Sequence, residues 1–213
     1  MSYRVKEIFY SLQGEGLYSG QPAVFCRFAG CNLWSGSEAD RKNALCPFCD
    51  TDFADVDGTD GGLYEAADEL AKKIARLWPE NKCKLNHPYV VCTGGEPLLQ
   101  LDAALIDALH KEGLEIAVET NGTIVAPPGI DWICVSPKAR AKLRQLSGNE
   151  LKLVYPQTGA EPEKYVGLGF GHFFLQPLDD DHREENIRRT LEYVLAHPRW
   201  RMSLQLHKIL NIR

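Results

Sequence analysis

The sequence lacks both a long apolar run and an excess of positive charge. No stretch approaches the roughly 18 consecutive apolar residues that a membrane-spanning helix needs, so we expect no membrane span. The opening MSYRVKEIFY has no continuous apolar segment of the secretory type. A formal net charge of -5 disfavours a general nucleic-acid-binding protein, which usually carries a basic excess. We therefore expect a cytoplasmic protein that binds neither membranes nor nucleic acids.

Internal repeats, low-complexity tracts and an even set of cysteines are also missing. The 213 residues are 44% hydrophobic and 25% charged, an ordinary composition for one domain around a single core. We therefore predict one domain over residues 1–213. Seven cysteines are an odd number in a chain without a secretory signal, which indicates metal binding or buried thiols rather than a disulfide framework.

Short apolar segments alternate with segments of helical periodicity along most of the chain. Strands are predicted at 23–28, 89–93, 115–120, 132–136, 150–155 and 172–176, with 203–210 as a further candidate. Apolar residues recur at helical spacing over 63–77, 101–113 and 187–194, the second with Asp102 as its cap and Gly113 as its stop. This alternation predicts βαβ units and a mainly parallel sheet. About six strands are too few for a closed eight-stranded barrel, so we expect an α/β fold with an open or partial (β/α) barrel.

The cysteines fall into distinct groups by their surroundings. Three lie inside predicted strands, where free cysteine packs as a small buried residue: Cys26, Cys92 and Cys134. Cys83 stands alone in a loop, and we expect it to be exposed. The remaining three lie beside the polar loops predicted at 32–45 and 53–62, at spacings of 14 and 2 residues: Cys31, Cys46 and Cys49.

Three cysteines are one too few for a structural zinc site, which takes four ligands. Cys26, Cys83 and His87 do not stand at a spacing that would supply a fourth. A thioredoxin-like role for Cys46 and Cys49 is disfavoured because that motif opens a helix after a strand. A trio of cysteines at this spacing therefore fits neither of these two patterns well. A zinc-stabilised interaction module stays open as the alternative to an enzyme.

Polar and turn-forming residues follow four predicted strands. These segments are Thr93 to Pro97, Glu119 to Gly122, Ser136 to Lys138, and Gln176 to Asp179. Ligands bind at the carboxyl ends of strands in parallel α/β proteins. Turn formation alone would explain one such segment, whereas four in succession favour a shared pocket. In the first segment, Gly94 and Gly95 would let the backbone approach a ligand closely.

Together, the three cysteines and the Gly-Gly-Glu segment resemble the radical S-adenosylmethionine (SAM) enzymes, in which such cysteines hold a [4Fe–4S] cluster. The chain is similar in particular to the 7-carboxy-7-deazaguanine synthase family of the queuosine pathway, in its branch with a long CX14CX2C cluster loop. The matching segments run nearly the whole chain: SLQGEG (11–16), FCRFAGCNLW (25–34), CDTDF (49–53), TGGEP (93–97), ETNG (119–122), SPK (136–138), QPLD (176–179) and HKILNI (207–212). Activating enzymes for glycyl-radical proteins, the alternative among enzymes, would not explain SLQGEG or the short chain.

The resemblance implies a radical SAM fold with an inserted cluster-binding loop over 31–49. It implies a carbon–nitrogen lyase that converts 6-carboxy-5,6,7,8-tetrahydropterin into 7-carboxy-7-deazaguanine with release of ammonia. The implied cofactors are a [4Fe–4S] cluster, SAM and Mg²⁺. The implied partners are the small-molecule pterin substrate, a reductant such as flavodoxin, and a second copy of the chain in a homodimer.

Site residues follow from the same resemblance, position by position. The cluster ligands would be Cys31, Cys46 and Cys49, and Thr51 would bind Mg²⁺ through a hard oxygen. Substrate would contact Leu12, Gln13, Gly14, Glu15, Arg27, Thr93 and the main-chain end of Arg213. SAM would contact Gly95, Ser136, Pro137, Lys138, Gln176, Pro177, Leu178 and Asp179. The resemblance assigns no partner to Glu119 or Asn121, and it leaves Glu96 without a firm contact.

Three further expectations rest on the residues themselves. Strand alternation places Arg27 on the face opposite Cys26, where its side chain either extends outward to solvent or faces a pocket, in which its guanidinium would suit a carboxylate. The segment 50–62 looks like a calcium loop, but Phe53 and Tyr64 stand where that motif needs acids, so calcium is rejected. The apolar segment 203–213 is expected to be docked rather than frayed.

Overall fold

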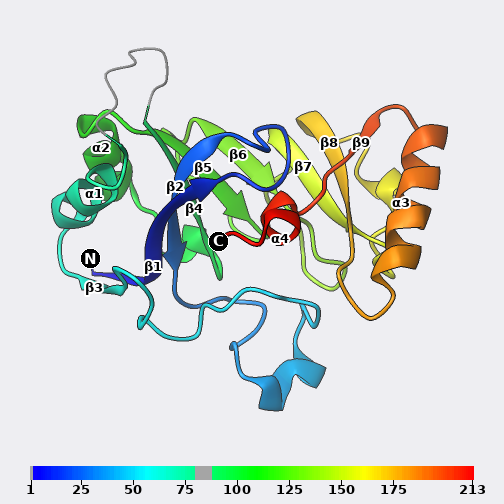
Figure 1. The fold of residues 1–213 in the computed structure, drawn as a ribbon, viewed down its shortest axis with the longest axis horizontal. Helices are drawn as coiled ribbons and strands as arrows, with labels where there is room; N and C mark the ends of the chain where they lie inside the picture. The colour runs from blue at the N-terminus through cyan, green and yellow to red at the C-terminus, as the bar shows by residue number, and fades with distance from the viewer. Residues whose placement is uncertain (1, 80–87) are drawn as a thin grey trace.

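The computed structural model describes residues 2–79 and 88–213, and their backbone is organised around one open sheet (Figure 1). Within these residues the sheet has nine strands in the order β3-β1-β2-β4-β5-β6-β7-β8-β9. The strands are β1 (Tyr3–Leu12), β2 (Pro22–Phe28), β3 (Gly62–Tyr64), β4 (Tyr89–Gly94), β5 (Glu115–Thr120), β6 (Trp132–Val135), β7 (Ser147–Tyr155), β8 (Gly169–Pro177) and β9 (Trp200–Met202). The edge strands β3 and β9 do not pair, so the barrel is partial, as predicted.

Seven of these strands run parallel to one another, namely β2 and all the strands from β4 to β9. The six predicted strands are all present within this parallel set, and β9 is the seventh. The strand β1 pairs antiparallel with both β2 and β3, and neither β1 nor β3 was predicted. The candidate strand at 203–210 is wrong. Leu206, Ile209 and Leu210 stand three and four residues apart, and this segment forms the short helix α4 (Leu206–Leu210).

Helices cover the outer face of the sheet. The helices α1 (Ala67–Ala75) and α2 (Ala103–Lys111) lie at one end of the sheet and α3 (Arg183–Ala196) at the other, whereas α4 lies near the middle and on the inner side (Figure 1). Asp102 caps α2, since its carboxylate accepts a hydrogen bond from the Leu105 amide at 3.0 Å, and Gly113 follows with φ 77°. The helix predicted over 63–77 begins later, because Leu63 pairs with Arg4 in the sheet.

Side-chain alternation separates the helix-covered core from the inner face of the sheet. Val24, Cys26 and Phe28 are buried in the main core beneath α1 and α2, as predicted, whereas Phe25 and Arg27 point to the inner face. Cys92 also packs in that core. Cys134 is buried too, but it lies on the inner face and borders the cavity described below. Cys83 lies outside the described residues.

The loop regions predicted at 32–45 and 53–62 contain little regular structure. Residues Glu38–Asn43 form the 3-10 helix η1, and two further single turns are η2 (Pro97–Leu99) and η3 (Pro162–Lys164). The second loop packs along β1, where the Ile8 amide donates to the Thr59 carbonyl at 2.8 Å. Among the helices of residues 2–79 and 88–213, none has the length and apolar character to cross a bilayer.

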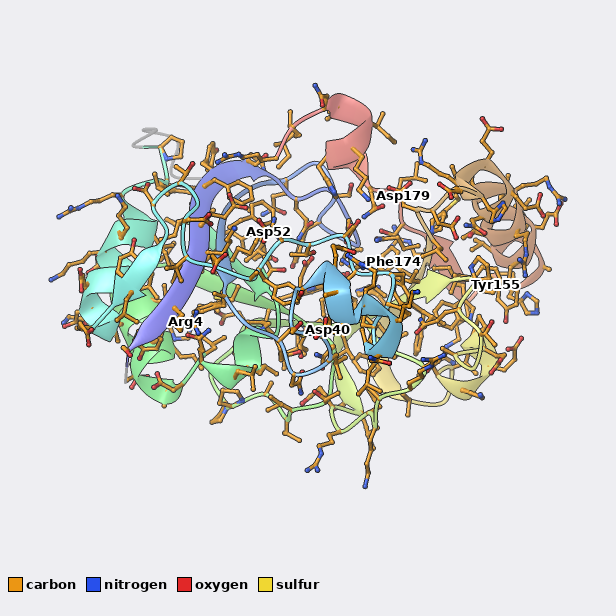
Figure 2. All side chains as sticks on the ribbon, turned by 90° about the horizontal axis from the view of Figure 1, so that it is seen from below. Arg4, Asp40, Asp52, Tyr155, Phe174 and Asp179 are labelled. Carbon is orange, nitrogen blue, oxygen red and sulfur yellow. The ribbon has the colours of Figure 1, made fainter. Side chains whose placement is uncertain are left out.

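The helix α4 is anchored to the inner side of the sheet. The Leu206 amide donates a 2.9 Å hydrogen bond to the Gly14 carbonyl, in the loop after β1. Lys208 forms ion pairs of 2.6 Å with Asp50, which follows the inserted loop, and with Asp179, which follows β8 and lies beside α4 in Figure 2. The inserted loop, the end of β8 and the C-terminal segment therefore close over one side of the sheet.

Candidate active site

A cavity of about 480 Å³ opens on the inner face of the sheet, between the carboxyl ends of the parallel strands and the loops that cover them. That volume suits a small-molecule site. The predicted site residues on its wall are Leu12, Gln13, Gly14, Glu15, Arg27, Cys31, Cys46, Cys49, Thr51, Thr93, Gly95, Ser136, Lys138, Gln176, Pro177, Leu178, Asp179 and Arg213. Only Pro137 among the predicted residues is buried away from this wall. Glu119 and Asn121 also line it.

Three thiols share one part of the cavity wall. Interaction between the neighbouring thiols of Cys46 and Cys49 raises the pKa of Cys46 and lowers that of Cys49. Burial raises the pKa of the Cys31 thiol. Cys134, the other cysteine on the wall, neighbours Glu150, Lys152 and Glu119 instead. The cysteine-rich part of the wall therefore offers three soft donors.

The described residues contain no group of three or more His, Cys, Asp or Glu side chains arranged around a single metal ion. A [4Fe–4S] cluster makes a different demand, because each thiolate binds its own iron and the three sulfur atoms need not converge on one point. Among the residues that the structure describes, Cys31, Cys46 and Cys49 share this part of the wall, and three such donors fit a cluster that keeps one iron open.

The inserted loop supports the turn that carries two of these cysteines. Arg41, from η1, donates 2.9 Å hydrogen bonds to the carbonyls of Pro47 and Cys49. Glu38 pairs with the same guanidinium and holds it in place. The long arm between Cys31 and Cys46 therefore returns to bind the backbone of the Cys46–Cys49 turn.

The Gly-Gly-Glu segment is shaped by close contact with the loop before Cys31. A Cβ added to Gly95 would lie 2.0 Å from the Gly30 carbonyl oxygen, so no larger residue fits. The next side chain, Glu96, is fully buried and does not line the cavity. Its carboxylate accepts 2.8 Å hydrogen bonds from the Thr120 hydroxyl and the Asn121 amide, and burial raises its pKa. Glu96 therefore ties the end of β4 to the end of β5.

Lys138 lies between the strand ends and the cysteines. Its ammonium donates to the Ser136 carbonyl at 2.8 Å and to the Ser136 hydroxyl at 2.7 Å, and it lies 5.9 Å from the centre of the Phe48 ring. Since Phe48 sits between Cys46 and Cys49, this contact brings a positive charge to the thiols. A cation in this position favours an anionic cluster or a ligand carboxylate.

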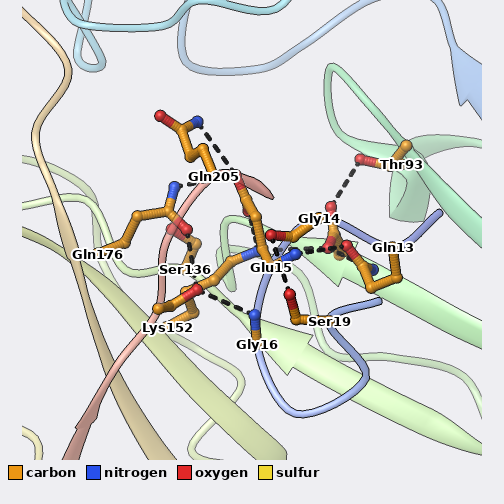
Figure 3. A network of polar contacts seen from close by, with 12 residues as sticks. Gln13, Gly14, Glu15, Gly16, Ser19, Thr93, Ser136, Lys152, Gln176 and Gln205 are labelled. Atoms are coloured by element: carbon orange, nitrogen blue, oxygen red, sulfur yellow. Dashed lines mark hydrogen bonds and ion pairs between the residues drawn. The ribbon is translucent and has the colours of Figure 1, made fainter. Parts of the chain in front are cut away.

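A second part of the cavity holds a charged cluster, shown in Figure 3. Lys152, from the middle of β7, forms ion pairs with Glu15 and, at 3.2 Å, with Glu119. The Gln13 amide and the Thr93 hydroxyl each donate to Glu119 at 3.2 Å. The Gln176 and Gln205 amides donate to Glu15 at 3.0 and 3.1 Å. Each carboxylate is thus held from more than one direction.

Arg27 and Arg213 bring positive charge to another part of the wall. Arg27 pairs with Glu7 through a 2.9 Å hydrogen bond, and Arg213 lies 3.8 Å from the same carboxylate. The main-chain oxygen of Arg213 accepts a 2.6 Å hydrogen bond from the Ser11 hydroxyl. The C-terminal segment is thus docked by polar contacts, although Ile209, Leu210 and Ile212 remain largely exposed.

Several residues of the site lie outside the predicted set. Lys152 and Gln205 belong to none of the sequence motifs. Arg41 lies in the segment 32–45, which the sequence indicates only as a polar loop. Lys152 has one sequence signal, because alternation through the strand 150–155 puts Glu150, Lys152 and Val154 opposite the core residues Leu151 and Leu153. A charged residue on such a face points to the inside of the sheet.

No protein-family model matches the chain. Curated relatives do match over the full length of both proteins. A 7-carboxy-7-deazaguanine synthase from Bradyrhizobium diazoefficiens is 61% identical over 213 residues, with 100% of each chain covered. The enzyme of the same name from Caulobacter vibrioides is 55% identical over 215 residues, again with 100% of each covered. A solved structure, the crystal structure of QueE from Escherichia coli, superposes with a TM-score of 0.70 at 28% identity and covers 97% of this chain and 95% of its own.

Proposed function

The chain belongs to the 7-carboxy-7-deazaguanine synthase family, and on this premise we propose its reaction and the residues that serve it. It is a radical SAM lyase that converts 6-carboxy-5,6,7,8-tetrahydropterin into 7-carboxy-7-deazaguanine with release of ammonia, in queuosine precursor biosynthesis. The observation that carries the residue assignments is the shared cavity. Every residue that the family resemblance assigns, apart from Pro137, borders it.

The cysteine-rich part of the cavity is the proposed cofactor end. Cys31, Cys46 and Cys49 would hold a [4Fe–4S] cluster, which together with SAM supplies the radical chemistry when bound. Gly95, Ser136 and Lys138 would hold SAM from one side. The segment Gln176 to Asp179 at the end of β8 would hold it from another, with Pro137 shaping the backbone behind. These residues bind and orient SAM and keep water from the reacting atoms.

The part of the cavity lined by Glu15, Arg27 and Thr93 is the proposed binding site for the pterin. Glu15 and the backbone from Leu12 to Gly14 would accept hydrogen bonds from the guanidine-like edge of the substrate, because ionised carboxylates are strong acceptors for N–H donors. Arg27 would bind the substrate carboxylate, after exchanging part of its pairing with Glu7. Thr93 and the main-chain end of Arg213 would complete the contacts. The negative charge of Glu15 at one end of the substrate and the positive charge of Arg27 at the other would then fix the orientation of the flat ring in the cavity.

Thr51 is the proposed protein ligand for Mg²⁺. Thr51 lines the cavity and stands two positions after Cys49 in the sequence. A cation bound there would lie between the cofactor end of the cavity and a substrate carboxylate. Magnesium takes hard oxygen ligands and keeps several waters, so one hydroxyl with substrate oxygens can form the site.

The assembly and context are proposed from the family resemblance. One domain over residues 1–213 is supported by the single sheet that runs through the described residues. A homodimer, a flavodoxin-type reductant and a cytoplasmic location complete the proposal.

The direct test is product formation by anaerobically reconstituted protein given SAM, reductant and the pterin. We expect 7-carboxy-7-deazaguanine, ammonia and 5′-deoxyadenosine in the products, and a brown protein that contains iron and sulfide. A colourless protein with bound zinc would favour an interaction module instead. Cleavage of SAM without deazaguanine product would contradict the assigned substrate.

A further inference from the structure

Lys152 is a buried cation in the wall of the substrate cavity. It extends from the middle of β7, and its side chain is only 6% exposed. Its ammonium bridges carboxylates from two separate elements, Glu15 in the loop after β1 and Glu119 near the end of β5. One side chain therefore links three parts of the chain, all of which border the cavity; Lys152 and Glu15 are seen within the surrounding polar network in Figure 3.

The charges in this cluster depend on one another. Burial by itself lowers the pKa of a lysine, but attraction from Glu119 and Glu15 outweighs that effect and raises the pKa of Lys152 well above its ordinary value. Burial likewise opposes ionisation of Glu119, yet the facing lysine lowers its pKa. One lysine against two glutamates gives the cluster an excess of negative charge, which attracts a hydrogen-bond donor.

The cluster also has fixed geometry. The Glu119 carboxylate is held by Lys152, Gln13 and Thr93, and the Glu15 carboxylate by Lys152, Gln176 and Gln205. A carboxylate oxygen has more than one lone-pair direction, so these oxygens can still accept a hydrogen bond from a molecule in the cavity. Within residues 2–79 and 88–213, Lys152 is the one side chain that binds both carboxylates.

We propose that Lys152 is a positioning residue for the substrate, which sets the orientation and the charge of Glu15 and Glu119 toward the donor edge of the pterin. The inference rests on the proposed function, in which Glu15 meets the guanidine-like edge of the ring. Without the lysine, two facing carboxylates repel each other, and one of them takes up a proton and becomes a donor. The cavity would then present the wrong polarity to the N–H groups of the substrate.

A role in stability alone does not account for this arrangement well. Buried ion pairs are often no more stabilising than apolar residues of similar volume, so they are weak devices for folding. Strongly perturbed ionisable groups inside a cavity are instead typical of functional sites. Both carboxylates and the lysine line the cavity, and this placement fits recognition of a ligand.

The central variant is Lys152→Met, which keeps the chain length and removes the charge. We expect KM for the pterin to rise at least tenfold, because the carboxylates lose their orientation. Binding of SAM and its slow cleavage without pterin should stay close to wild type. The matched control is Lys6→Met, since Lys6 also is mostly buried and bridges two carboxylates, Asp52 and Asp57, but does not line the cavity. It should lose thermal stability without the rise in KM.

A second variant tests whether charge balance is the cause. Lys152→Met/Glu119→Gln restores one net negative charge, so its KM should lie between those of the wild type and Lys152→Met. If Lys152→Met does not fold, the double variant is compared directly with the wild type, and a severalfold higher KM is expected. The proposal would be overturned if Lys152→Met, or the double variant where Lys152→Met does not fold, had the same KM for the pterin as the wild type. It would also be overturned if Lys6→Met showed the same rise in KM. Failure of the proposed function is distinguishable, because the wild type itself would then form no deazaguanine product.

Discussion

The guanidinium of Arg41 lies 4.0 Å from the centre of the Trp34 ring. Trp34 is buried edge-on against Phe53, with ring centres 5.6 Å apart, so it offers a fixed face for the cation. The same guanidinium binds the carbonyls of the turn between Cys46 and Cys49. The 14 residues between Cys31 and Cys46 are therefore a support for that turn.

Replacing Arg41 by methionine should loosen this turn. The carbonyls of Pro47 and Cys49 would lose their donor, so we expect several-fold faster loss of the iron–sulfur chromophore in air, followed by visible absorbance and by iron content. Arg188→Met is the matched control, because Arg188 pairs with Glu185 and Glu192 on the surface of α3, away from the cavity. Equal rates of loss in the two variants would contradict a supporting role for Arg41.

Replacing Cys46 by alanine should abolish both cluster retention and SAM cleavage, because the cluster loses one of its three protein ligands. Iron and acid-labile sulfide in the reconstituted protein provide the measurement. Cys92→Ala serves as the control, since Cys92 is packed in the core beneath the helices. Full iron and activity in Cys46→Ala would remove that residue from the ligand set.

Replacing Thr51 by valine should reduce the stimulation of turnover by Mg²⁺. Valine has nearly the same shape but no oxygen to offer the cation. The iron content should stay at the wild-type level, which separates this effect from loss of the cluster. Turnover is measured over a series of magnesium concentrations, and a wild-type response in the variant would exclude Thr51 as a ligand.

Replacing Glu96 by glutamine should destabilise the fold rather than weaken contact with SAM directly. All the partners of its carboxylate are donors, and the amide nitrogen of glutamine would face at least one of them. The expected loss is about 1–3 kcal/mol of unfolding free energy, the usual cost of an unsatisfied buried polar group. Denaturant unfolding measures it, with Thr120→Val completing a double-mutant cycle. Additive effects of the two changes would argue against coupling of Glu96 to Thr120.

The parallel part of the fold could be predicted from the sequence because its strands and helices carry clear hydrophobic periodicity. The segment 203–210 could not, since its first apolar residues alternate as in a strand while Leu206, Ile209 and Leu210 follow helical spacing. The strand β1 gave no such signal: its antiparallel place beside β2 depends on long-range pairing. Local pattern alone does not determine that pairing.

The gathering of the strand-end motifs around one cavity was also predictable, because the carboxyl ends of parallel strands share an edge. The direction of individual side chains was harder to predict. Glu96 belongs to a ligand-binding motif but turns into the protein, where donors from the end of β5 satisfy it. Lys152 lies within a strand and in no motif, and its two partners come from distant parts of the sequence.

The parallel strands lie in the sheet in the same order as they occur along the chain. Each parallel strand therefore pairs with the parallel strand that precedes it along the chain, and a crossover connection joins the two. The cover of the cavity forms differently, since the contact between Gln205 and Glu15 joins residues 190 positions apart, and that between Ser11 and Arg213 joins residues 202 apart. The order of the parallel strands thus depends on pairing between successive elements, whereas one wall of the cavity depends on contacts between the two ends of the chain.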